Sequence, residues 1–157
     1  MEAKRYIRVN MVEAEPMTAY EFDDFKKREH SGENCEGYKV VYDDGYVSWC
    51  PKARFEEVSR EIDRMNFGMA IEAMKKGHKV ARKGWNGKGM YIWIMPGSVI
   101  ENCPNITDPH LKQISDINGG KIEFTGSIRM KTADGKVLTG WLASQTDMLS
   151  DDWCIVE

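Results

Sequence analysis

The sequence predicts an α+β fold: a small, mainly antiparallel sheet with a packed N-terminal helix, preceded by a small α+β N-terminal module. Short strand patterns meet at Asp44-Gly45 and Asp134-Gly135, pairs that accept the positive φ angles of a tight hairpin turn. Connections are short and no strand–helix–strand alternation occurs, which favours antiparallel pairing. The charge balance also changes, because residues 1–64 carry 11 Lys and Arg against 15 Asp and Glu, whereas residues 65–157 carry 11 against 10. We therefore predict a module of unknown role in residues 1–63 and a second domain in residues 65–157.

The first module is predicted to contain two helices and three strands. The alternating pattern from Arg5 to Val12 predicts a strand. Thr18 and Glu21 form a capping box, which predicts a short helix through Phe22 and Phe25. The remaining elements expected here are a polar loop at 28–37, strands at 38–43 and 46–49, and a helix opened by Pro51.

The second domain begins with an amphipathic helix, which places the boundary near Asp63 to Met65. Asn66 is a good N-cap, and apolar residues recur at helical spacing from Phe67 to Met74, before Gly77 ends the helix. The remaining elements expected here are a strand at 78–82, a turn at 84–87, a strand at 90–95, a long loop at 96–120, strands at 122–131 and 136–138, a helical turn framed by Ser144 and Asp147, and a strand at 153–156.

Composition excludes several classes of protein. With 41% hydrophobic and 30% charged residues, the chain has an ordinary globular mix, so disorder and coiled coil are poor interpretations. A net charge of -3 removes the attraction on which nonspecific duplex binders depend, and no nucleic-acid partner is expected. No apolar run is long enough to span a bilayer and the N-terminus does not resemble a signal peptide, so we expect a cytoplasmic protein without a membrane partner.

The usual signatures of metal sites and catalysis are also missing from the sequence. The four cysteines are scattered without a C-x-x-C pair, so neither a zinc site nor a disulfide framework is expected. There is no P-loop, no G-x-G-x-x-G, no H-E-x-x-H and no G-x-S-x-G, and the three histidines show no partner spacing. We therefore predict no catalytic residue, no metal ligand and no cofactor, and a protein that is not an enzyme.

A basic and aromatic segment from Lys75 to Trp93 is the first candidate ligand site. Residues 73–100 contain no Asp or Glu, yet six Lys and Arg side chains lie there among Trp85, Tyr91 and Trp93. Cations can hold phosphates while aromatic faces stack on a base, so this composition suits a flat, phosphorylated ligand. The alternative is that these lysines are simply solvated on the surface of a helix, a turn and a strand.

The segment from Trp141 to Met148 is the second candidate, because five of its eight residues carry side-chain hydrogen-bonding groups. Ser144 and Asp147 have an equally good structural explanation as a capping box, and Trp141 could belong to the core.

Five segments of the second domain resemble the second Thoeris anti-defense family, in that family's order and near its spacing. They are Met65 to Gly68, Val80 to Met90, Met130 to Gly135, Trp141 to Leu149 and Asp152-Trp153. The resemblance implies a phage or prophage protein in the cytoplasm of an infected bacterium. Such a protein would sequester, without degrading it, the cyclic ADP-ribose isomer that activates Thoeris defence. It also implies a homotetramer with pockets between protomers, and leaves room for binding of cyclic dinucleotides.

Mapped onto the matching motifs, the resemblance implies a set of ligand-binding residues. Trp85 and Trp141 would form walls or stacking surfaces for the ligand. The predicted hydrogen-bonding and phosphate-binding residues are Arg82, Asn86, Lys88, Ser144, Gln145 and Asp147. Two alternatives stay open: an enzyme that cleaves the signal with Asp147 as base, and a structural or single-strand-binding phage protein that uses the basic and aromatic segment.

Overall fold

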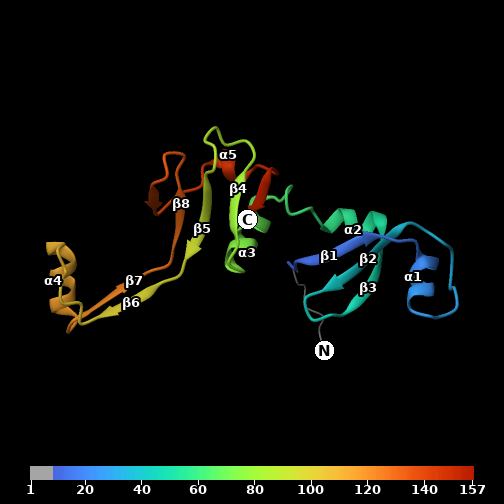
Figure 1. The fold of residues 1–157 in the computed structure, drawn as a ribbon, viewed down its shortest axis with the longest axis horizontal. Coiled ribbons are helices and arrows are strands. Elements are labelled where there is room, and N and C mark those ends of the chain that lie inside the picture. Colours follow the sequence, from blue (N-terminus) through green and yellow to red (C-terminus); the bar gives the residue numbers. More distant parts are fainter. Residues whose placement is uncertain (1–8) are drawn as a thin grey trace, which may run out of the picture. The chain divides into compact units, whose positions relative to one another are not determined.

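The computed structural model describes residues 9–157, which fold as two compact units (Figure 1). One unit ends at Glu61 and the other runs from Ile62 to Glu157. Their strands form a three-stranded, a five-stranded and a two-stranded sheet, and every pairing in these sheets is antiparallel. Five helices accompany them in the described part of the chain. The α+β class predicted from the sequence is therefore confirmed.

The first unit is a three-stranded sheet with a helix before and after its last two strands. Its elements are β1 (Val12–Pro16), α1 (Ala19–Phe25), β2 (Gly37–Tyr42), β3 (Val47–Pro51) and α2 (Lys52–Val58). The predicted capping box is present at α1: Thr18 Oγ1 accepts from the Glu21 amide at 3.3 Å, and Glu21 Oε2 accepts from the Thr18 amide at 2.7 Å.

The first strand lies further along the chain than the sequence pattern predicted. Residues 5–8 of the predicted strand lie outside the described residues, and the strand that forms runs from Val12 to Pro16. Its position is set by pairing, because Val12 lies opposite Tyr42 and Pro16 lies opposite Tyr38 at the two ends of the partner segment. Pro16 is tolerated there because β1 is an edge strand.

The second unit packs helix α3 (Phe67–Lys75) against one face of a five-stranded sheet. The Asn66 side chain caps the helix by accepting from the Met69 amide at 2.9 Å. The strand order is β10-β4-β5-β8-β9, with bounds Trp153–Val156, Lys79–Arg82, Tyr91–Met95, Ser127–Lys131 and Val137–Thr139. The core between helix and sheet consists of Met65, Ala70, Ala73, Met74, Val80, Ile92, Met130 and Trp153.

The predicted loop at 96–120 is wrong in part, because it contains a strand and a helix. Strands β6 (Ser98–Glu101) and β7 (Lys121–Phe124) form a hairpin arm that carries helix α4 (Pro109–Ile117) at its far end (Figure 1). Asp108 caps α4 by accepting from two backbone amides of its first turn, and Pro109 occupies the first turn.

The predicted strand at 122–131 is likewise interrupted, and two strands replace it. β7 ends at Phe124 and β8 begins at Ser127, so the chain passes from the arm into the main sheet between them. Gly97 lies so close to this crossing that an added Cβ would sit 2.8 Å from the Phe124 carbonyl oxygen. The close approach of two backbones at a glycine therefore separates the arm from the sheet.

Among residues 9–157, no helix combines the length and apolar character needed to cross a membrane.

Candidate ligand-binding site

Three tryptophans from separate parts of the second unit form one aromatic cluster. Trp85 follows β4, Trp141 follows β9, and Trp153 opens β10. Their ring centroids lie 5.4 to 6.3 Å apart in edge-to-face arrangements, a geometry that aromatic pairs favour. Trp153 is fully buried, whereas Trp85 and Trp141 keep part of their surface exposed. The cluster therefore offers a rigid aromatic wall rather than freely moving rings.

The carboxylate of Asp147 fixes the position of Trp85 in this cluster. Its Oδ1 accepts from Trp85 Nε1 at 3.0 Å and from Arg82 Nη1 at 2.9 Å. Its Oδ2 accepts from Ser144 Oγ at 2.7 Å and from the Ser144 amide at 3.0 Å. A carboxylate has about four lone-pair sites, so these four donors saturate it. Asp147 is thus a junction between the tryptophan cluster and helix α5 (Gln145–Met148).

Arg82 connects two carboxylates and is itself nearly covered, with 11% of its side chain exposed. Its Nε donates to Asp152 Oδ1 at 2.8 Å, and the Gly84 amide donates to Asp152 Oδ2 at 2.8 Å. The hydrogen bond from Arg82 lowers the pKa of Asp152. This pairing fastens the turn after β4 to the segment before β10. Asp152 is not among the predicted ligand-binding residues. No local sequence pattern could have related it to Arg82, which is distant in the chain.

Burial alone would raise the pKa of Asp147, but hydrogen bonds from Ser144, Trp85 and Arg82 outweigh burial and lower the pKa to about 2. A carboxylate with this pKa and with occupied lone pairs is a poor general base. The possibility of an enzyme that uses Asp147 as its base therefore loses its chemical support.

Because the folded protein holds the pKa of Asp147 below the unfolded value of about 4, this group stabilises the fold above pH 4. That contribution, about 2 kcal/mol, is lost as the pH falls toward 2. We expect urea unfolding measured at pH 6 and at pH 2.5 to show this loss. The variant Asp147→Asn should have a correspondingly weaker pH dependence. An identical pH dependence for both proteins would contradict the assignment.

The structure brings together five of the eight predicted ligand-binding residues. These are Arg82, Trp85, Trp141, Ser144 and Asp147, whose contacts join them directly or through the tryptophan cluster. Asn86, Lys88 and Gln145 follow members of this group in the chain, and their side chains are exposed. Within residues 9–157 no hydrogen bond or ion pair occupies these three side chains. No group of three or more metal-ligating side chains gathers in this part of the chain.

Comparison with known proteins identifies the second unit. Residues 65–156 match the family model of the Thoeris anti-defense 2-like domain. The chain is also 35% identical over 99 residues to Thoeris anti-defense 2 from Bacillus phage SP01, a match that covers 59% of this chain and 96% of the phage protein. The tryptophan cluster and the Asp147 network lie within the matched residues. The chain therefore belongs to the Thoeris anti-defense 2-like family and is a phage protein directed against Thoeris defence.

Proposed function

We propose that this protein binds cyclic ADP-ribose-type immune signals, the glycocyclic ADP-ribose isomers, and holds them without degrading them. The observation that carries the proposal is the aromatic wall of Trp85 and Trp141, braced by Asp147, with three unoccupied polar side chains beside it in the sequence. The signal would thereby be kept from the Thoeris effector.

The proposed ligand has an adenine, two riboses and a pyrophosphate, and the candidate site has a group for each kind of contact. The tryptophan faces supply apolar surface, the amides of Asn86 and Gln145 can pair with base or ribose, and the Lys88 ammonium can meet a phosphate. The sequence also predicts direct ligand contacts for Arg82, Ser144 and Asp147. Their hydrogen bonds to one another support an additional role, which is to hold Trp85 in place.

We further propose that the site is completed by a second copy of the chain, within a homotetramer. Leu142 and Leu149 flank helix α5 and are 87% and 82% exposed. Two such apolar side chains beside a polar ligand site are expected to be covered by protein. Stoichiometric capture also requires tight binding, about -12 kcal/mol at a nanomolar dissociation constant, which needs a ligand buried on most sides.

The experiment that tests sequestration follows the chemical fate of the signal. Purified protein is incubated with the product of a TIR-domain enzyme, unbound ligand is removed by filtration, and the protein is heated to release what it holds. Intact cyclic ADP-ribose isomer, recovered by mass spectrometry after heating, is the expected result. A linear or fragmented product would establish cleavage instead. A signal left wholly in the filtrate would refute the proposal and direct the same assay to cyclic dinucleotides.

Substitution of the three exposed polar side chains should weaken capture without changing the fold. We expect Lys88→Gln, Asn86→Ala and Gln145→Ala each to weaken binding by roughly tenfold, because a hydrogen bond to a bound ligand contributes about 1 to 2 kcal/mol. Calorimetric titration with the purified signal measures this effect, and thermal melting checks the fold. Lys136→Gln is the matched control, since Lys136 is an exposed lysine in the turn between β8 and β9. Equal affinities for all four variants would remove these residues from the site.

A further inference from the structure

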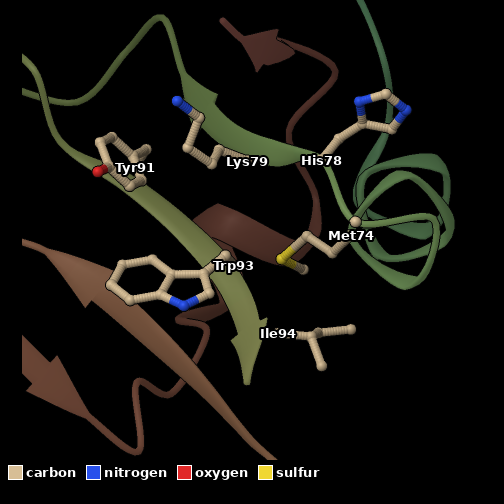
Figure 2. A pocket seen from close by; sticks show the side chains of 7 residues that line it. Met74, His78, Lys79, Tyr91, Trp93 and Ile94 are labelled. Carbon is tan, nitrogen blue, oxygen red and sulfur yellow. The ribbon is translucent and has the colours of Figure 1, made fainter. Parts of the chain in front are cut away.

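The five-stranded sheet has a second face, which is the one turned away from α3. Val80 of β4 lies opposite Ile92 of β5, and both belong to the core beneath α3. Successive side chains of a strand point to opposite faces, so the neighbours of Ile92, Tyr91 and Trp93, project from the other side. Figure 2 shows their rings next to each other along β5, pointing away from Ile94. Two aromatic rings thus mark the centre of this second face.

Cations lie on both sides of these two rings. On β8, Lys131 lies opposite Tyr91 and Arg129 lies opposite Trp93. The ammonium of Lys79, on β4, is 5.3 Å from the Tyr91 ring centroid, and that of Lys131 is 5.8 Å from it. We name these five residues the basic aromatic face.

A pocket of about 200 Å³ opens at the edge of this face, between the end of α3, the start of β4 and strand β5. His78, Lys79, Tyr91 and Trp93 contribute to its lining, and Met74 and Ile94 supply apolar surface from the α3 side (Figure 2). Aromatic, apolar and cationic groups therefore meet in one small concave site.

Within the described part of the chain, no carboxylate forms an ion pair with the cations of this face. Among residues 9–157, none of the ion pairs involves Lys79, Arg129 or Lys131. Lys131 donates to the Gly89 carbonyl at 2.9 Å. Arg129 Nε is buried and has no hydrogen-bond partner within the described residues. A buried donor without an acceptor is costly, and three uncompensated cations around two rings attract an anion.

We propose that the basic aromatic face is a nucleotide site, taking a ligand with one flat base and an attached phosphate. The base packs against Tyr91 and Trp93, and the phosphate accepts hydrogen bonds from Arg129 and the neighbouring lysines. This site is separate from the tryptophan cluster, because Trp153 of that cluster and Arg82, which lies opposite it on β4, are on the α3 side of the sheet.

The geometry favours a single nucleotide over a single strand of nucleic acid. The rings of Tyr91 and Trp93 lie 5.6 Å apart with their planes 52° apart, so they pack on each other and leave no gap for two separately stacked bases. The pocket beside them is also small, and it offers space for one base rather than for a run of bases.

Calorimetric titration of the full chain with adenosine 5′-monophosphate tests the proposal. We expect this probe to bind more tightly than adenosine or inorganic phosphate alone, because each lacks one half of the recognised chemistry. Trp93→Ala and Arg129→Gln should each weaken binding by roughly tenfold or more, whereas Trp93→Phe should retain most of it. Lys136→Gln removes an equal charge elsewhere on the second unit and should leave the affinity unchanged.

Three results would overturn this inference. One is no binding of the probe by the wild-type chain, and another is binding that neither Trp93→Ala nor Arg129→Gln weakens while both variants remain folded. The third is an affinity for oligothymidylate that rises with strand length and is lost in the same variants, which would make the face a single-strand site.

Capture of the cyclic ADP-ribose signal, measured on the same variants, separates this inference from the proposed function. Trp93→Ala and Arg129→Gln should retain signal capture, and loss of both activities together would show one shared site instead of two. If the wild-type chain binds adenosine 5′-monophosphate at this face but ignores the cyclic signal, the proposed function fails and the nucleotide site stands.

Discussion

Replacing Asp147 with Asn should lower the free energy of unfolding by about 3 kcal/mol, because it removes one charge from a covered ion pair and two acceptor positions from a saturated group. The carboxylate is 12% exposed and accepts from Arg82, Trp85 and Ser144. An Asn side chain offers one oxygen, and its amide nitrogen would face a donor. Arg82 keeps its contact with Asp152 in this variant. The loss of free energy of unfolding should therefore be smaller than for a buried arginine left without any carboxylate partner.

Urea unfolding at neutral pH measures this effect, and the turn between β8 and β9 supplies the control. Asp134 is an exposed carboxylate that accepts hydrogen bonds from Thr132 and Lys136. Asp134→Asn should leave the unfolding midpoint nearly unchanged, because solvent screens an exposed pair and replaces its hydrogen bonds. If both variants unfold at the same urea concentration, the Asp147 network does not stabilise the fold as described.

The contacts of Asp147 show how much of the candidate site can be predicted from the sequence. The spacing of Ser144 and Asp147 predicts a capping box, and the structure contains it. That pattern accounts for the contacts of Oδ2 alone. The donors to Oδ1, Arg82 and Trp85, lie more than 60 residues away along the chain, and their meeting depends on the order of the strands. Local spacing therefore predicted the contact between Ser144 and Asp147, but not the two donors that meet Oδ1.

In the hairpin arm the sequence contains a local helix-start pattern, but the composition of the segment led to the prediction of a loop. Asp108 followed by Pro109 is a helix-start pattern, and the structure begins α4 there. The surrounding segment is rich in Pro, Gly and Asn, which is typical of a loop and led to the prediction of one at 96–120. By contrast, helix α3 was predicted well because its cap at Asn66 and its apolar spacing agree.

The double variant Leu142→Lys, Leu149→Lys should fold but form a smaller oligomer than the wild-type protein. It should bind the cyclic signal at least about 100-fold more weakly. Both side chains are exposed in one copy, so their replacement removes little packing within the chain. If a second copy covers them, burying two lysines there would destabilise the association of the two copies. The bound ligand would then be exposed to solvent on one side. A loss of about 3 kcal/mol in binding corresponds to a factor of about 100.

Sedimentation velocity reports the mass of the variant and calorimetric titration its affinity, with Val58→Lys as the matched control. Val58 is an exposed apolar residue of α2, in the unit outside the family match, so this control should keep both mass and affinity. A folded monomer that captures the signal at full strength would show that one chain completes the site. An intact oligomer with full affinity would place the interface elsewhere. The control adds one lysine and the double variant adds two, so the single variants Leu142→Lys and Leu149→Lys give the charge-matched comparison with Val58→Lys.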